Sequence, residues 1–193
     1  MSGYSELLVL REKIKAEGIP TLREETFFLL AREIERKKPK KILEIGTSYG
    51  ISGILMLLKS EATLATVEKD ERAICAAREN FRAFGLNKRV TLFIGDADEI
   101  VPELSGSYDF ILLDGPKGKY FTYYPFLKDV LAAGGELFAD NVLLKEYGLR
   151  HKERRNRTAH KNMESFIGAV QGDEEMSARF LDMEDGVLIA EKR

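Results

Sequence analysis

The stretch "KILEIGTSYGISGILMLLKS", residues 41–60, decides the fold, because it predicts two kinds of secondary structure joined by a short turn. The apolar run at 41–45 predicts a short buried strand, and residues 50–59 are expected to be helical. Between them, Gly46 and Gly50 form either an ordinary tight turn or one in which the backbone closely approaches a ligand. A strand that leads through a turn into a helix is the repeating unit of a parallel sheet.

Strands and helices continue to alternate on the C-terminal side of this stretch. The expected strands are 41–45, 62–68, 89–95, 108–114 and 135–140, and the helices between them are 50–59, 70–84, 97–104 and 119–131. Two further helices, at 4–16 and 21–38, are expected ahead of the first strand. This alternation predicts a parallel sheet that is covered by helices on both faces.

The C-terminal part departs from the alternation. Apolar residues at helical spacing between Met163 and Val170 predict one more helix. The segments "SARFLDM" (177–183) and "GVLIAEK" (186–192) flank an Asp-Gly turn and predict an antiparallel hairpin. The predicted fold class is therefore α/β: a doubly wound, seven-stranded, mostly parallel sheet with a C-terminal antiparallel hairpin.

Length and composition limit the classes of function. The 193 residues predict one domain, 1–193, in which N-terminal helices (1–38) precede a core (39–193). A net charge of −2 provides no overall field for a polyanion. Cys75 is the only cysteine, so an intrachain disulfide is impossible, and two histidines make a zinc site of the usual ligands unexpected. Because neither a membrane-spanning segment nor a signal peptide is visible, we expect a cytoplasmic protein.

Acidic residues stand at or just after the ends of the five expected parallel strands. They are Glu44, Glu68, Asp96, Asp114 and Asp140, and Asn141 follows the last of them. Ligands of an open parallel sheet bind outside the carboxyl ends of its strands. Acidic side chains gathered there repel one another unless cations or hydrogen-bond donors join them. The pattern therefore predicts a ligand, a metal ion, or both.

Two of these acids have both a functional and a structural interpretation. Glu68 is placed to accept hydrogen bonds from ribose hydroxyls, or it is a helix-cap acid. Asp96 is placed to meet an adenine amino group, or it simply caps the next helix. The glycine turn after the first strand lacks G-x-G-x-x-G spacing, which weighs against a nicotinamide dinucleotide.

The motifs "ILEIGTSYG", "VEKD", "GDA", "LLDGPKGKY" and "ADNVL", in this order and spacing, resemble those of a known enzyme family. The family is the S-adenosylmethionine-dependent, metal-dependent O-methyltransferases, which include the catechol and caffeoyl-CoA enzymes and have a Rossmann-like class I fold. The resemblance runs from about residue 19 to the C-terminus. Within the family, the chain looks most similar to the bacterial branch that methylates 5-hydroxyuridine at the tRNA wobble position.

The resemblance implies a role for each matching residue. Glu44 and Gly46 would line the methionine end of S-adenosylmethionine, Glu68 would hold the ribose, and Asp96 and Ala97 would flank the adenine. Asp114, Asp140 and Asn141 would coordinate Mg²⁺, with Asp114 also bordering the cofactor, and Lys117 would be the catalytic base. A homodimer is implied as well.

The proposed metal ligands suit a hard cation. Two carboxylates and one amide oxygen favour Mg²⁺, Mn²⁺ or Ca²⁺ over zinc, and Asn141 adds an oxygen without adding a third negative charge. A divalent ion lowers the pKa of an acceptor hydroxyl, and Lys117 follows Asp114 closely enough to reach the same hydroxyl. The alternatives are a turn at Asp140–Asn141 and a surface or ion-pairing role for Lys117.

A basic stretch, "LRHKERRNRTAHK" at residues 149–161, follows the metal motif. Its cations include Arg150, Arg154, Arg155 and Arg157. These arginines would clamp the phosphates of an RNA stem-loop, or they belong to a solvated loop and helix start. The aromatic residues of the segment 120–124 would stack on bases or, more simply, pack the helix.

The main hypothesis is methylation of 5-hydroxyuridine in a tRNA anticodon loop. Its nearest alternative is the same chemistry on a small catechol-like or hydroxycinnamoyl acceptor. More distant alternatives are a nicotinamide-dependent oxidoreductase and a non-catalytic RNA-binding protein on the same fold.

Overall fold

The computed structural model describes residues 2–144 and 154–193. It divides into two compact units, Met1–Ala97 (unit 1) and Asp98–Arg193 (unit 2), which are described separately. The expectation of a single domain over 1–193 stays a prediction.

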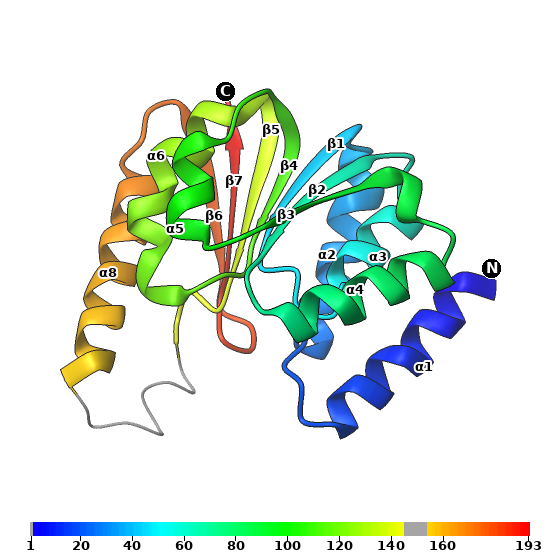
Figure 1. The fold of residues 1–193 in the computed structure, drawn as a ribbon. Helices are drawn as coiled ribbons and strands as arrows, with labels where there is room; N and C mark the ends of the chain where they lie inside the picture. The colour runs from blue at the N-terminus through cyan, green and yellow to red at the C-terminus, as the bar shows by residue number, and fades with distance from the viewer. Residues whose placement is uncertain (1, 145–153) are drawn as a thin grey trace. The chain divides into compact units, whose positions relative to one another are not determined.

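Unit 1 contains the first three strands and the helices around them. Its elements are α1 (Ser2–Ala16), α2 (Glu24–Lys37), β1 (Lys41–Ile45), α3 (Ile51–Leu58), β2 (Thr63–Glu68), α4 (Glu71–Ala83), the 3₁₀ helix η1 (Asn87–Arg89) and β3 (Val90–Ile94). Strand β2 pairs in parallel with β1, Leu64 lying opposite Ile42, and with β3, Leu64 lying opposite Val90. Helices α1 and α2 both contact α3 (Figure 1).

Helix α3 is buried because its sequence, "ISGILMLL", is apolar on every side except at Ser52. Gly53 allows the helix to lie close to its neighbours. A Cβ atom there would come within 2.8 Å of Leu64 Cδ2 on β2 and 2.9 Å of Phe81 Cζ on α4. The glycine turn is therefore followed by a helix that is held tightly against both the strand and the helix that come after it.

Unit 2 contains the remaining strands, including the antiparallel ones. From the boundary onward the elements are α5 (Ala97–Ile100), η2 (Val101–Glu103), β4 (Tyr108–Leu113), η3 (Lys117–Lys119), α6 (Tyr120–Val130), β5 (Leu131–Asp140), α8 (Arg154–Gln171), β6 (Met176–Leu181) and β7 (Val187–Lys192). Strand β5 pairs in parallel with β4 and antiparallel with β7, which also pairs antiparallel with β6.

The seven strands have the order β3-β2-β1-β4-β5-β7-β6. This confirms the predicted class, a mostly parallel seven-stranded α/β sheet that ends in an antiparallel hairpin.

The expected boundaries of two elements were wrong. The helix expected at 97–104 is one turn, α5, followed by the 3₁₀ helix that contains Pro102, which cannot donate a backbone hydrogen bond. Strand β5 starts at Leu131, with a register shift between Tyr108 and Phe110 on β4.

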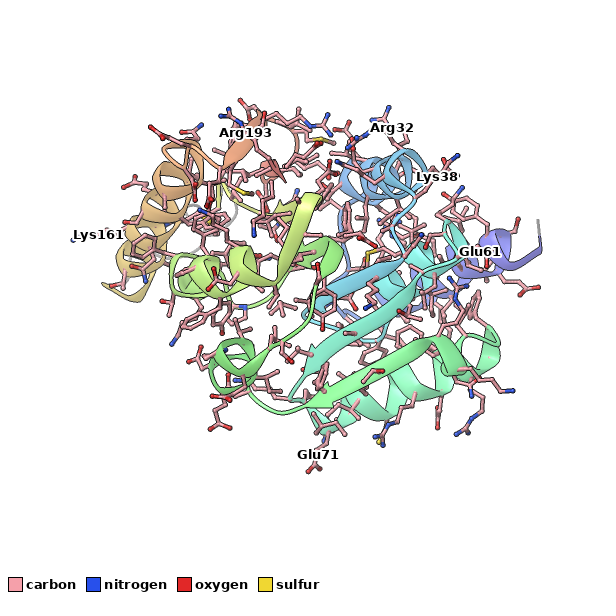
Figure 2. All side chains as sticks on the ribbon, turned by 90° about the horizontal axis from the view of Figure 1, so that it is seen from above. Arg32, Lys38, Glu61, Glu71, Lys161 and Arg193 are labelled. Carbon is pink, nitrogen blue, oxygen red and sulfur yellow. The ribbon has the colours of Figure 1, made fainter. Side chains whose placement is uncertain are left out.

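Helices α6 and α8 lie side by side in unit 2 (Figure 1). Tyr120 and Tyr124 of α6 meet Phe166 of α8 edge to face, with ring centroids 5.5 and 5.9 Å apart. Charged side chains such as Glu71 of α4 and Lys161 of α8 project outward (Figure 2). Among the described residues, no helix is long and apolar enough to cross a membrane.

Substituting Gly53 tests the packing of α3. We expect Gly53→Ala to lower the free energy of unfolding by about 1–3 kcal/mol, because the added methyl group overpacks the contact with Leu64 and Phe81. Chemical denaturation measures the change. Gly168→Ala is the matched control, since it lies in helix α8 with no atom within 4 Å of the added Cβ, and it should be neutral or stabilising. Equal effects of the two substitutions would contradict the packing argument.

Candidate functional site

The glycine turn of unit 1 is tied to the end of β2 by backbone hydrogen bonds. Gly46 N–H and Thr47 N–H both donate to the carbonyl oxygen of Val67, each at 3.2 Å. Ser48 N–H then donates to Glu68 Oε2 at 2.8 Å. Gly46, at φ 106°, and Gly50, at φ 81°, occupy the left-handed region that glycine adopts without strain. The turn is therefore held to the carboxyl end of β2 in a fixed shape.

Glu68 is an acceptor for the loops around it and does not cap α4. Its Oε1 atom accepts hydrogen bonds from Lys69 N–H and Asp70 N–H, both at 2.9 Å. Asp70 is the N-cap of α4 and accepts from Ala73 N–H at 2.8 Å. Because an ionised carboxylate has about four acceptor positions, Glu68, which is half-buried, keeps capacity for ligand hydroxyls.

Glu44 lies beneath the turn, with no exposed surface. Its two carboxylate oxygens accept from Ser52 Oγ at 2.5 Å and from Thr66 Oγ1 at 2.6 Å. Thr47 Oγ1 lies 2.6 Å from Thr66 Oγ1 and extends this network to the turn. The hydroxyl groups were missed by sequence reasoning; the only signal was polar residues inside an otherwise apolar strand and helix. They satisfy an acid that would otherwise be costly to bury.

Asp96 and Ala97 follow β3, next to Glu68. Gly95 N–H donates to the carbonyl oxygen of Glu68 at 2.9 Å, and Lys69 Nζ donates to Asp96 Oδ2 at 3.0 Å. Ala97 is the first residue of α5. Unit 1 therefore brings the turn, Glu68 and Asp96 together, while Glu44 supports the turn from below.

Asp114 and Asp140 lie at the carboxyl ends of the neighbouring strands β4 and β5. The residues immediately before them, Leu113 and Ala139, are a register pair. Asp140 is 3% exposed. Burial, and then the negative charge of Asp114, raise the pKa of Asp140 to about 7. The two carboxylates therefore lie close enough to repel each other.

Lys117 supplies the local positive charge. Its Nζ atom donates to Asp114 Oδ1 at 2.6 Å and to the Tyr120 hydroxyl at 2.9 Å. Burial lowers the pKa of Lys117, but the nearby acids outweigh burial, so its pKa lies above the ordinary value. In this arrangement Lys117 is a cation paired with Asp114. This favours the ion-pair alternative, and a role as base requires the lysine to lose that proton first.

The backbone at Asn141 explains the choice of residue. Asn141 has φ 57°, a left-handed conformation that asparagine tolerates better than most residues. Its N–H donates to Asp140 Oδ1 at 2.7 Å. The next residues, Val142 and Leu143, donate backbone hydrogen bonds to the carbonyl oxygens of Gly186 and Asp185 at 3.0 and 2.8 Å. The turn of the C-terminal hairpin thus fixes the loop that follows Asp140.

The donor set fits a hard divalent cation. Two acids, one of them nearly buried, meet at neighbouring strand ends, and their repulsion is what a cation would relieve. An asparagine follows directly. Among the described residues, no group of three His, Cys, Asp or Glu side chains is placed to hold a metal ion. The predicted set of two carboxylates and an amide suits Mg²⁺ better than zinc.

Tyrosines 120, 123 and 124 are buried, so the helix-packing alternative for them is confirmed. Phe121 is 47% exposed.

Of the basic stretch, Arg150 lies outside the residues that the structure describes, and the side chains of Arg154, Arg155 and Arg157 are not described either. Lys161 is exposed and projects outward from α8 (Figure 2).

Comparison with known sequences identifies similar proteins. The sequence profile of the O-methyltransferase family matches residues 7–193. A catechol O-methyltransferase from Niastella koreensis is 29% identical over 73% of the chain and 68% of the relative. A caffeoyl-CoA O-methyltransferase from Stellaria longipes is 26% identical over 60% of the chain and 51% of the relative. The chain spans only 43% of the O-methyltransferase hkm8 of Aspergillus hancockii.

Solved structures share the fold. A putative caffeoyl-CoA O-methyltransferase from Staphylococcus aureus has a TM-score of 0.87 at 24% identity, covering 97% of this chain and 92% of that one. An O-methyltransferase from Bacillus cereus, solved with S-adenosylhomocysteine (SAH), has a TM-score of 0.83 at 22% identity, covering 100% and 91%. At these identities the similarity establishes the fold.

Removing the ammonium group of Lys117 tests the charge balance of the two acids. We expect Lys117→Met to lower the free energy of unfolding by about 2–3 kcal/mol, because it leaves Asp114 and Asp140 without their cation. Lys119→Met is the matched control: Lys119 pairs with Asp98 at 2.6 Å, and both side chains are nearly half exposed, so its loss should cost less than about 1 kcal/mol. Urea denaturation compares the two, and a smaller loss for Lys117→Met would refute the argument.

Proposed function

The chain belongs to the O-methyltransferase family, and from this membership we propose that it is an S-adenosylmethionine-dependent O-methyltransferase with a small catechol-like or hydroxycinnamoyl acceptor. The observation that carries the proposal is the cluster of Asp114, Lys117 and Asp140 at neighbouring strand ends, with Asn141 next to it. This cluster has the residue types that bind and ionise an acceptor hydroxyl.

Unit 1 would bind the methyl donor. Gly46 and the turn would lie against the methionine end, with Glu44 supporting the turn and bordering this end. Glu68 has remaining acceptor capacity for the two ribose hydroxyls. Asp96 and Ala97, which follow β3 after Gly95, would flank the adenine. In unit 2, Asp114 would also border the cofactor, as the resemblance implies.

Unit 2 would bind the acceptor. A divalent ion held by Asp114, Asp140 and Asn141 would lower the pKa of the acceptor hydroxyl and fix its position. Lys117 would accept the hydroxyl proton at Nζ. The attraction of Asp114 and Asp140 opposes loss of the lysine's own proton until their charge is shared with another cation. The acceptor oxygen would then bond to the methyl carbon as the sulfur–carbon bond breaks, and S-adenosylhomocysteine would leave.

The acceptor is the least defined part of the proposal. The relatives named as catechol and caffeoyl-CoA O-methyltransferases support a small hydroxylated aromatic compound. The basic stretch at 149–161 is the feature that favours a tRNA hydroxyuridine as a second candidate. The family membership leaves the nicotinamide oxidoreductase alternative without support. The homodimer and the cytoplasmic location stay predictions.

Assays with labelled S-adenosylmethionine and Mg²⁺ separate the acceptors. We expect label to appear in catechol or a caffeoyl thioester, because the relatives with such names match this chain. Hydroxyuridine-containing tRNA from a methylation-deficient strain is the parallel substrate. Transfer to tRNA alone would replace the small-acceptor proposal with the tRNA one, and transfer to neither would count against both.

Substituting Asp140 tests the division of roles between the units. We expect Asp140→Ala to lower kcat for methyl transfer at least about 100-fold, because it removes one of the two acids of the cluster. Binding of S-adenosylhomocysteine, measured by calorimetry, should stay within about 3-fold, which is about 0.7 kcal/mol. Asp129→Ala, an exposed acid on α6, is the control and should retain activity. Retained turnover in Asp140→Ala under metal chelation would exclude the metal role.

A further inference from the structure

The hydroxyl group of Tyr120 lies at the meeting point of three parts of the acid cluster. Tyr120 is the first residue of α6 and has no exposed surface. Its oxygen lies 2.8 Å from the carbonyl oxygen of Leu113, 3.2 Å from that of Asp140, and 2.9 Å from Lys117 Nζ. A tyrosine hydroxyl has one proton to donate and can also accept. It therefore donates to one of the two carbonyls, or is shared between them, while it accepts from the lysine.

These contacts connect the two strands at the point where their own pairing ends. The last register pair between β4 and β5 is Leu113 with Ala139. Asp114 comes after the end of β4, and Asn141 turns into the left-handed conformation directly after Asp140. A hydrogen bond that bridges Leu113 and Asp140 therefore limits how far apart the backbones that carry the two acids can move.

The same oxygen also directs Lys117. The ammonium group has three protons. One goes to Asp114 Oδ1 and another to the Tyr120 hydroxyl, while the ring centroid of Tyr120 lies 5.3 Å from Nζ. A phenylalanine would keep the ring beside the lysine but would remove the acceptor that orients it.

We propose that Tyr120 is a positioning residue: its hydroxyl sets the spacing of Asp114 and Asp140 and orients Lys117 toward Asp114. This inference rests on the proposed function, because it assigns Tyr120 to the preparation of that site. A ring that merely fills space would need no hydroxyl. Here one oxygen atom contacts two strand ends and the cation, so its effect should appear in the binding properties of the cluster rather than only in stability.

Tyr124 provides a matched control on the same helix. It too is buried and meets Phe166 edge to face, at 5.9 Å and 80° compared with 5.5 Å and 81° for Tyr120. Its hydroxyl, however, donates to Asp173 Oδ2 at 2.8 Å, in the turn after α8. Tyr120→Phe and Tyr124→Phe therefore remove the same group from similar packing, and only the first touches the acid cluster.

The experiment measures Mn²⁺ binding to the whole chain by calorimetry or electron paramagnetic resonance, without any acceptor. Tyr120→Phe should bind Mn²⁺ roughly 10–100-fold more weakly than wild type, the range found when a group that orients metal ligands is removed. Its kcat for methyl transfer should fall about 10-fold or more while the KM for S-adenosylmethionine stays unchanged. Tyr124→Phe should match wild type in all three quantities. Thermal unfolding of both variants identifies any general loss of fold.

The outcomes separate this inference from the proposed function. Wild-type affinity for Mn²⁺ in Tyr120→Phe, or equal weakening in Tyr124→Phe, would overturn the positioning role, as would a wild-type chain that binds no Mn²⁺. A wild-type chain that binds Mn²⁺ but methylates no acceptor would instead overturn the proposed function, and the Mn²⁺ affinities would still decide the role of Tyr120. If Tyr120→Phe does not fold, Tyr120→His, which keeps a polar ring, takes its place and should bind Mn²⁺ more tightly than Tyr120→Leu.

Discussion

Two neighbouring acids, with one cation paired to the first of them, are the constraint on which the candidate site depends. Asp114 and Asp140 follow paired residues of neighbouring strands, so the parallel register places them at adjacent strand ends. Asp140 is almost fully buried, and its raised pKa is the electrostatic result of burial and of that closeness. Lys117 reduces this repulsion between the two carboxylates, because its Nζ atom lies 2.6 Å from Asp114 Oδ1. A site built in this way favours cations, which is the property that ionising a hydroxyl requires.

The surrounding structure keeps these groups in place through hydrogen bonds rather than through charge. The Tyr120 hydroxyl contacts the backbone of both strands, and the hairpin turn at Asp185–Gly186 holds the loop after Asn141. Gly186 is needed there, because its φ is 81° and a Cβ atom would lie 2.5 Å from Leu143 Cγ. The antiparallel end of the sheet thus has a direct part in shaping the site.

In unit 1, hydrogen bonds also hold the acidic side chains in place, and here the donors are neutral. Glu44 is buried among hydroxyl groups, and Glu68 accepts backbone N–H groups from the turn and from its own loop. Both acids stiffen the turn that would meet the methyl donor. Preorganised acceptors of this kind suit a cofactor with a ribose, since little rearrangement is then needed on binding.

The sequence by itself determined the α/β fold class, the C-terminal hairpin and the acids at the strand ends. Burial imposes a periodic pattern of apolar residues, and this pattern can be detected from neighbouring positions in the sequence. The cap of α4 at Asp70 is likewise a contact that is local in sequence. Only the tertiary structure decided that Lys117 is a cation paired with Asp114, that Tyr120 bridges β4 and β5, and that Ser52 and Thr66 satisfy Glu44. These contacts depend on strand register and on the direction of single side chains, and neither leaves a periodic signal in the chain. A turn at Asp140–Asn141 was an alternative from the sequence, but the left-handed conformation of Asn141 was not predicted, because the hairpin that holds the next residues comes from the far end of the sequence.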